Sequence, residues 1–193
     1  MALVLAKNLG KKLEDMNVIV AHIGGGNSIA LWSHAHPVDV VPGDACTFSA
    51  ERAGFMRSER MVQLVEEYGA ETCTKWLHGK GGMVSLLGTN DLREVEKMIV
   101  AGDAEALKCQ QAMAYQLCKC ICSLFPVVEG KLDGIIITGG GAYWERLTDD
   151  VKARLADTNV PVYIQPGENE MQSLAEGALR ALRGEEVVQK YEG

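Results

Sequence analysis

Two glycine triplets, each placed directly after an apolar strand-like stretch, are the features of this 193-residue sequence best suited to chemistry. Gly24, Gly25 and Gly26 follow the apolar residues 18–23, and Gly139, Gly140 and Gly141 follow the apolar residues 134–138. Glycine has no Cβ and adopts positive φ at little cost, so such turns can aim several N–H groups at one anion. One triplet alone is equally typical of an ordinary hairpin. Two triplets in this setting predict two walls of one nucleotide site.

Two side chains near the first triplet are suited to act on a phosphate. His22 lies two residues before the triplet, where the end of a strand would deliver a titratable donor. Arg52 lies in a short irregular segment, and its planar guanidinium suits bidentate contact with phosphate or carboxylate. The simpler alternatives are a hydrogen-bonded core histidine and a surface arginine.

Other nucleotide-binding motifs fit less well. Residues 78–89 are rich in glycine and contain one lysine, but they lack the G-x-x-x-x-G-K-[ST] spacing, so we predict a loop there. The second triplet lacks G-x-G-x-x-G spacing and an acidic residue placed for a ribose, which disfavours a Rossmann dinucleotide domain.

A metal centre is not predicted from the cysteine and histidine spacing. Cys118, Cys120 and Cys122 lie in a helical stretch, where the first and third share a face and the second points elsewhere. We therefore interpret the six cysteines as reduced, small hydrophobic residues of a cytosolic protein. His34 and His36 are interpreted as surface turn residues. The residues that would hold any metal stay unknown.

Composition limits the partners and the compartment. The net charge of −7 and the lack of a basic stripe argue against nucleic acid as a partner. No apolar run reaches the ~18 residues of a membrane span, and the first lysines come after the opening apolar stretch, unlike in a signal peptide. We therefore expect a cytoplasmic location and no membrane. The opening residues have the spacing of an amphipathic helix, which suggests the later part of a longer polypeptide: Leu3, Leu5, Ala6, Leu9 and Leu13.

The order of elements predicts the fold class. We expect an α/β domain of ribonuclease-H-like type, the actin-like or sugar-kinase-like arrangement, with three antiparallel strands, then helices, then two further parallel strands with crossover helices. The expected strands are 18–23, 27–31, 38–41, 134–138 and 162–165, and the expected helices are 60–68, 70–77, one capped by 89–91 and ending near 100, one capped by 102–103 and ending near 126, 142–156 and 171–183.

Seven segments, in order along nearly the whole chain, carry a resemblance to a known family. They are V-A-H-I-G-G-G-N-S (20–28), F-S-A-E-R-A-G (48–54), G-K-G-G-M-V (79–84), L-G-T-N-D-L-R-E-V-E-K (87–97), M-A-Y-Q (113–116), I-T-G-G-G-A-Y (137–143) and P-G-E-N-E-M-Q-S-L-A-E-G-A-L-R-A-L-R-G-E-E (166–186). The sequence resembles the acetate and butyrate kinase family, and its butyrate-type members most closely.

The resemblance implies a function for the chain and a missing partner. These kinases use ATP and Mg²⁺ to phosphorylate a short-chain carboxylic acid, here a short-chain fatty acid such as butyrate. They have two halves, and the first carries a phosphate loop and the wall of the acid pocket. Nothing here matches that half, so residues 1–193 are expected to be the C-terminal nucleotide-binding domain, with the N-terminal half of the same kinase as partner and a homo-oligomer as the assembly.

The resemblance also assigns roles to individual residues. It implies that His22 contacts the transferring phosphoryl group and that Arg52 stabilises its charge in the transition state. The residues implied to bind ATP or ADP are Gly24, Gly25, Gly26 and Asn27 in the second phosphate loop and Gly139, Gly140, Gly141, Ala142 and Tyr143 in the adenosine motif. A carboxylate is already a nucleophile, so the absence of a general base agrees with this chemistry.

The sequence departs from the family pattern at several positions, which keeps alternatives open. Ala50 stands where Pro is usual and Ala53 where Ser is usual, residues 55–60 replace a segment that usually contains Gly-Asp, and 142–144 lack the metal-associated glutamate of acetate kinases. An acetate or branched-chain acid kinase, or a non-catalytic nucleotide-binding or dimerising module, is the alternative function.

Overall fold

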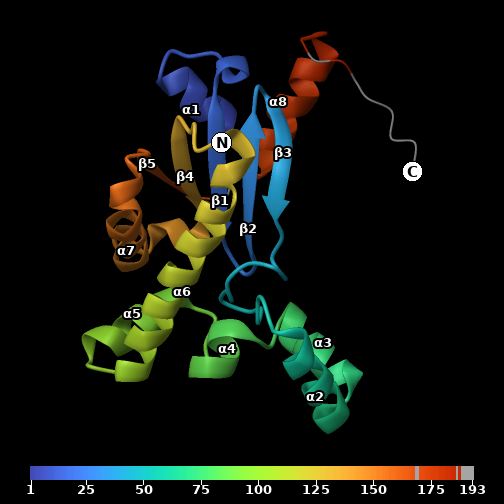
Figure 1. Cartoon of the computed structure of the whole chain (residues 1–193), viewed down its shortest axis with the longest axis vertical. Coiled ribbons are helices and arrows are strands. Elements are labelled where there is room, and N and C mark those ends of the chain that lie inside the picture. Colours follow the sequence, from blue (N-terminus) through green and yellow to red (C-terminus); the bar gives the residue numbers. More distant parts are fainter. Residues whose placement is uncertain (168–169, 186, 188–193) are drawn as a thin grey trace.

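A mixed five-stranded sheet forms the centre of the molecule in the computed structural model, which describes residues 1–167, 170–185 and 187 (Figure 1). The strand order is β3-β2-β1-β4-β5. The first three strands are antiparallel neighbours, and β4 and β5 run parallel to β1. This topology confirms the predicted fold class. The strands are β1 (Asn17–Ile23), β2 (Asn27–Ser33), β3 (His36–Val41), β4 (Gly134–Gly139) and β5 (Val162–Pro166).

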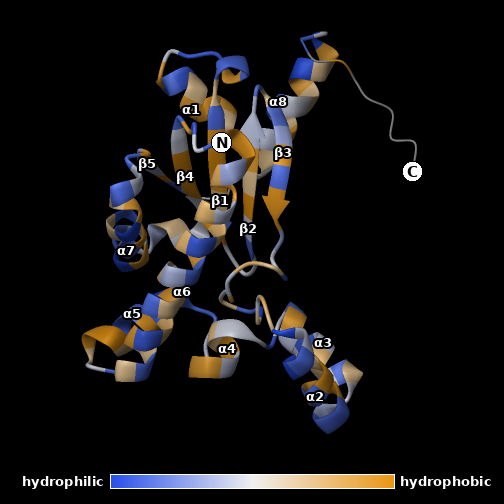
Figure 2. Ribbon diagram, in the orientation of Figure 1, coloured by the Kyte–Doolittle hydropathy of each residue, from blue (hydrophilic) through white to orange (hydrophobic). Residues whose placement is uncertain are grey.

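The central strands are hydrophobic on both faces because helices cover both sides (Figure 2). Alternate residues of β1 point to opposite cores: Ile19 belongs to the larger cluster, with α6 and α7, whereas Val18 belongs to the smaller cluster, with α1. The helices that provide these faces are α1 (Ala2–Asn8), α6 (Ala104–Ser123) and α7 (Glu145–Leu155). The helix expected at the start of the chain is present, but it ends at Asn8, so Leu9 lies just beyond it and Leu13 lies in the 3₁₀ turn η1 (Leu13–Asp15).

Helix α6 is the long core helix that the sequence predicts. Asp103 caps its N-terminus by accepting hydrogen bonds from the N–H groups of Glu105 and Ala106. With the following 3₁₀ turn η2 (Phe125–Val128), the stretch Ala104–Val128 is long and apolar enough to span a membrane by length and composition alone. Core helices of soluble proteins pass the same test, and the apolar stripe of α6 packs against the sheet in the larger core.

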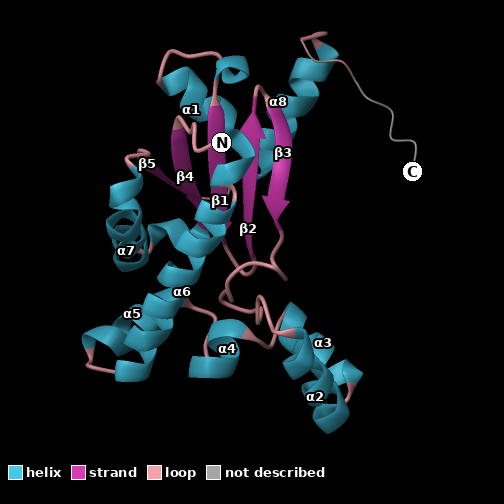
Figure 3. Cartoon of the chain, in the orientation of Figure 1, coloured by secondary structure: helices cyan, strands magenta, loops and turns pink. Residues whose placement is uncertain are grey.

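Four short helices and a long connecting segment gather at one end of the sheet (Figure 3). Residues 42–57 contain neither helix nor strand, and they lead into α2 (Ser58–Tyr68), α3 (Ala70–His78), α4 (Gly82–Leu87) and α5 (Leu92–Val100). The prediction of a loop over 78–89 is wrong, because residues 82–87 form α4. The short helix was hidden by the two glycines at its start.

Smaller corrections concern the ends of elements. The helix predicted from residue 142 begins only at Glu145, because Gly140–Tyr143 form the 3₁₀ turn η3. The long helix ends at Ser123 rather than near 126. His34 lies in the turn, but His36 is the first residue of β3, and both are exposed as predicted. A further 3₁₀ turn, η4 (Ala156–Thr158), follows α7, and the last helix that the structure describes is α8 (Glu170–Leu182).

Candidate active site

The His22 ring lies between the two glycine triplets. His22 is in β1, paired with Thr138 of β4, so the parallel register brings the ends of both strands to the same edge of the sheet. A Cβ built on Gly24 would lie 3.0 Å from Nε2 of His22, and one built on Gly139 would lie 3.0 Å from its Cε1. The structure therefore brings together the two turns that the sequence places 113 residues apart, with a half-buried imidazole between them.

The first glycine turn is fixed by Asn27 and leaves two donors free. Asn27 is buried; its Oδ1 accepts from the N–H of Gly24 (3.3 Å) and its Nδ2 donates to the carbonyl of Phe48 (3.1 Å). In the described part of the chain, the N–H groups of Gly25 and Gly26 have no protein acceptor. Asn27 thus holds the turn with its side chain facing the protein, and the two free N–H groups can bind an anion.

Arg52 lies directly against the first turn. A Cβ on Gly26 would approach Cζ of Arg52 to 2.8 Å, so only a glycine lets the guanidinium lie flat on this backbone. The buried Ser49 holds the arginine segment in place: its hydroxyl donates to the carbonyl of Gly25 and accepts from the N–H of Arg52 (3.1 Å). Arg52 is exposed and makes no ion pair with the described residues, so its charge is available to a ligand.

The N-terminus of α4 is hydrogen bonded to the segment that contains Arg52. The N–H groups of Met83 and Val84 donate to the carbonyls of Ser49 (3.0 Å) and Ala50 (3.1 Å). Gly82 has φ of +57°, and a Cβ there would lie 2.1 Å from the Ser49 carbonyl oxygen. The glycine-rich stretch predicted as a loop is therefore the backbone support of Arg52.

Glu51 is a carboxylate at this site that the sequence reasoning did not select. Its Oε1 accepts from Nδ2 of Asn90 (2.7 Å), and a Cβ on Gly25 would lie 3.3 Å from its Oε2. The backbone N–H of Glu51 also donates to the carbonyl of Gly25 (3.2 Å). Glu51 thus connects the glycine turn to the segment that leads into α5.

The second glycine turn packs against the end of β1. Gly139 has φ of +89°, and a Cβ there would lie 2.4 Å from the carbonyl oxygen of Ile23. A Cβ on Gly141 would lie 2.4 Å from Cγ2 of the same isoleucine. Ala142 is buried beneath the turn, and Tyr143 is 68% exposed. The missing side chains of the two glycines allow η3 to sit on β1 and to present Tyr143 outward.

A cavity of about 460 Å³ lies between η3 and α5, beside the second turn. Gly140 and Tyr143 line one side, and Leu92, Arg93 and Lys97 line the other. Its volume lies within the usual range of small-molecule sites, and an aromatic ring and two cationic side chains line it. The cavity walls come from segments about 50 residues apart, so only the fold shows that they form one site.

Glu96 of α5 connects the two sides of the cavity. Its carboxylate accepts from Nε and Nη2 of Arg146 (both 2.8 Å) and from Nε1 of the buried Trp144 (2.7 Å). Hydrogen bonding from Arg146, with a further contribution from Trp144, lowers the pKa of Glu96. The pair joins α5 to the start of α7, so the cavity has a fixed wall.

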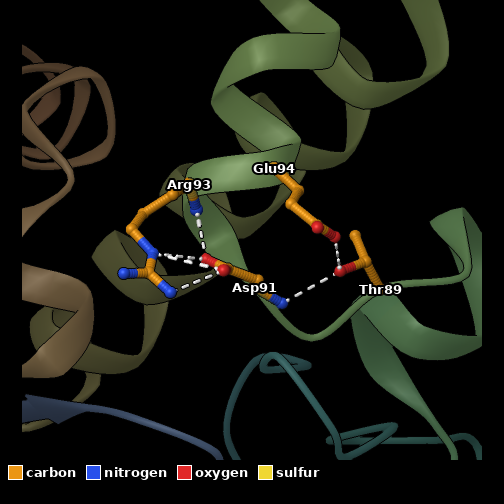
Figure 4. Close-up of polar contacts among 4 residues, drawn as sticks. All are labelled: Thr89, Asp91, Arg93 and Glu94. Carbon is orange, nitrogen blue, oxygen red and sulfur yellow. Dashed lines mark hydrogen bonds and ion pairs between the residues drawn. The ribbon is translucent and has the colours of Figure 1, made fainter.

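The α5 wall of the cavity begins at the capped N-terminus of that helix, drawn in Figure 4. Asp91 accepts from the N–H of Arg93 (2.9 Å) and pairs with its guanidinium through Nε (2.9 Å) and Nη2 (2.7 Å). Hydrogen bonds from Arg93 lower the pKa of Asp91 to about 2. Thr89 bridges the same turn, since its hydroxyl accepts from the N–H of Asp91 (3.1 Å) and donates to Glu94. Arg93 is thereby anchored at the cavity wall.

Comparison with known proteins assigns the chain to a family. Residues 2–155 match the acetokinase family, and this region is well over half of the chain. The chain belongs to the acetokinase family. The sequence resemblance is confirmed at this level, and the assignment to butyrate-type members remains a finer prediction.

Solved structures share the fold of this acetokinase-family chain. An acetate kinase from Porphyromonas gingivalis superposes with a TM-score of 0.83 at 21% identity, covering 92% of this chain and 52% of that one. A propionate kinase from Francisella tularensis gives 0.78 at 21% identity (88% and 50%), and an acetate kinase from Entamoeba histolytica gives 0.78 at 20% identity (92% and 55%). The chain therefore spans about half the length of these structures.

Proposed function

We propose that this chain is the nucleotide-binding half of an ATP-dependent kinase that phosphorylates a short-chain carboxylic acid, with butyrate as the preferred acid. The observation that carries the proposal is the position of His22, whose ring contacts both glycine turns while Arg52 lies flat on the first. Membership of the acetokinase family supports the carboxylate as acceptor. Butyrate rests on the resemblance of the seven sequence segments.

The proposed chemistry needs charge and position rather than a base. In phosphoryl transfer the protein mainly orients donor and acceptor and stabilises charge on the equatorial oxygens. The free N–H groups of Gly25 and Gly26 would bind phosphate oxygens, and the exposed guanidinium of Arg52 would contact the transferring group. His22 would donate to the same group from the opposite side. These groups supply positive charge locally in a chain whose net charge is −7.

The cavity beside η3 would hold the nucleoside of ATP. The exposed Tyr143 ring offers a stacking surface for a purine, and Arg93 and Lys97 offer cations to the phosphates. Residues 139–143 would then serve as the adenosine motif, with Gly140 and Tyr143 touching the ligand and Gly139, Gly141 and Ala142 shaping the turn.

The side-chain oxygen atoms near the first turn suit a Mg²⁺ ion that is bound together with a nucleotide. This ion usually takes one or two protein carboxylates, with phosphate oxygens and waters as the other ligands. No group of three or more His, Cys, Asp or Glu side chains suited to a metal occurs among the described residues. Glu51 and the amide oxygen of Asn90 would therefore hold the ion jointly with the nucleotide. When bound, Mg²⁺ would neutralise phosphate charge.

We further propose that the acid pocket and the first phosphate loop come from an N-terminal half of the same kinase. The apolar side chains of α8 support a contact with that half or with a second copy, since Met171, Leu174 and Leu182 are 80%, 70% and 86% exposed. In-line transfer requires both halves, because holding donor and acceptor together is worth ~7–11 kcal/mol.

The test is a hydroxamate assay that traps acyl phosphate. A chain that contains both halves should form butyryl phosphate from butyrate and ATP, with a higher kcat/KM than for acetate, propionate or isobutyrate. The 193-residue chain alone should give no acyl phosphate. Turnover by this chain alone would contradict the two-half proposal. A higher kcat/KM for acetate than for butyrate would show that acetate is the preferred acid.

A further inference from the structure

A second cavity, of about 330 Å³, lies between α6 and the segment that follows β3. Cys46, Thr47 and Phe55 line it from residues 42–57, and Tyr115 and Cys120 line it from α6. None of these residues lines the cavity beside η3. The second cavity is therefore a separate site, with two thiols in its wall.

The two thiols line the same cavity although they come from different elements. Each thiol is the largest single influence on the pKa of the other, and the backbone of Thr47 lowers the pKa of both. Cys46 is 1% exposed, whereas Cys120 is partly exposed to the cavity. The Cys120 thiol can therefore react with a dissolved reagent, whereas the Cys46 thiol is shielded from solvent.

An unpaired hydroxyl indicates that the cavity suits a small polar molecule. Thr47 is 1% exposed, and its Oγ1 has no hydrogen-bond partner among the residues that the structure describes. A buried hydroxyl without a partner is costly, so a bound polar group would be stabilised there. The unpaired hydroxyl belongs to the residue that follows Cys46 and that lines the same cavity as the two thiols.

We propose that Cys46 and Cys120 form a reactive thiol pair, which a small hydroperoxide in this cavity oxidises to a disulfide. The Cys120 thiolate attacks the terminal peroxide oxygen, the O–O bond breaks, and the leaving oxygen takes a proton. Cys120 becomes a sulfenic acid. The sulfur of Cys46 then attacks the Cys120 sulfur, forms the S–S bond and releases water. Two thiols and one hydroperoxide thus give one disulfide, one alcohol and one water, or two waters from hydrogen peroxide.

The surroundings assign the order of the two steps. The neighbouring Cys46 thiol lowers the pKa of Cys120, with help from the Thr47 N–H and the Lys119 ammonium. The Cys120 thiol and burial raise the pKa of Cys46, which is also the more deeply buried of the two. Burial raises the pKa of Cys109, which is also partly exposed on α6. Cys120 is thus the attacking thiol and Cys46 the resolving one.

The disulfide would connect α6 to the segment that carries Arg52. Cys46 lies six residues before the arginine, and its carbonyl accepts from the N–H of Phe55 (2.8 Å). The disulfide would therefore tie α6 to a segment that already forms a closed turn through the hydrogen bond between Phe55 and Cys46.

The experiment treats the reduced 193-residue chain with one equivalent of hydrogen peroxide at pH 7 and maps the peptides without reduction. The expected product is one intramolecular link between the peptides of Cys46 and Cys120. With a limiting alkylating reagent, Cys120 should react severalfold faster than Cys109, because the pKa of Cys120 is lowered whereas burial raises that of Cys109.

Alanine variants separate the two roles, and circular dichroism checks that each is folded. Cys46→Ala should stop at a sulfenic acid on Cys120, trapped by dimedone, whereas Cys120→Ala should leave Cys46 reduced. Cys109→Ala is the matched control on α6 and should still form the link. A map in which the first disulfide joins other cysteines, or in which Cys120 is oxidised without linking to Cys46, would overturn the proposal without touching the kinase function. If an alanine variant does not fold, the map of the unaltered chain decides.

Discussion

Gly141→Ala tests whether the second glycine turn is shaped by its contact with the end of β1. The new Cβ would lie 2.4 Å from Cγ2 of Ile23, a fully buried core atom, whereas carbon atoms in contact are usually 3.5–4.0 Å apart. The turn must therefore move by about 1 Å. Overpacking of this kind costs about 1–3 kcal/mol, so we expect the melting temperature to fall by about 2–12 °C.

The same shift should weaken nucleotide binding, because Gly140 and Tyr143 line the cavity and move with the turn. We expect ADP to bind at least about tenfold more weakly, a change of ~1.4 kcal/mol, measured by calorimetry. Ile23→Leu removes Cγ2 at a cost below ~1.5 kcal/mol, so the double variant should be more stable than the sum of the single effects by about 1 kcal/mol.

The control for this prediction is Gly177→Ala in α8, where the new Cβ meets, among the described residues, only Nη2 of Arg180 at 3.7 Å. It should raise stability by about 0.5–1 kcal/mol and leave ADP binding unchanged. Additive effects of Gly141→Ala and Ile23→Leu, or unchanged ADP affinity in Gly141→Ala, would refute the reasoning from the turn geometry.

Three further predictions concern individual side chains. In a chain with both halves, His22→Ala should lower kcat by ~10²–10³-fold with little change in the KM for ATP, and a raised KM with intact kcat would show a structural role. Arg52→Ala should lower kcat similarly, and Arg52→Lys should not restore it because the bidentate fork is lost; full activity of the lysine variant would exclude that role. The pKa of Asp91 is lowered to about 2, so its pair with Arg93 stabilises the fold above pH ~4 and is lost as the pH falls through ~2. Asp91→Asn should therefore melt below the unaltered chain at pH 6 but not at pH 2, and an equal gap at both pH values would contradict this.

The sequence predicted those parts of the fold that depend on local pattern. The apolar runs before each glycine triplet indicated β1 and β4, and the alternation of elements indicated the mixed sheet. The location of both triplets at one edge of the sheet could be expected as well, because parallel strands deliver their ends to the same edge. What local pattern could not give is the His22 ring lying against both turns, which depends on the exact register of β1 and β4.

Features that depend on long-range backbone contacts were missed. Helix α4 begins with two glycines, a poor helix start by propensity, and it forms because its first N–H groups bind the carbonyls of Ser49 and Ala50. Nothing in the sequence distinguishes Glu51 from the other charged residues. Its contacts with Asn90 and with the first glycine turn appear only in the structure. The cavity walls from α5 and the thiol pair of Cys46 and Cys120 likewise join segments that no sequence motif connects.

Titration of the 193-residue chain with ADP in a calorimeter tests whether the two glycine turns form a nucleotide site. We expect weak binding, detectable at millimolar ADP, because both turns and the cavity beside Tyr143 lie within this chain. Tyr143→Ala should weaken binding by a further tenfold or so, since stacking on an aromatic ring is worth ~1–3 kcal/mol per base. The absence of any binding heat at millimolar ADP, or an affinity that Tyr143→Ala leaves unchanged, would contradict the assignment of this site to a nucleotide.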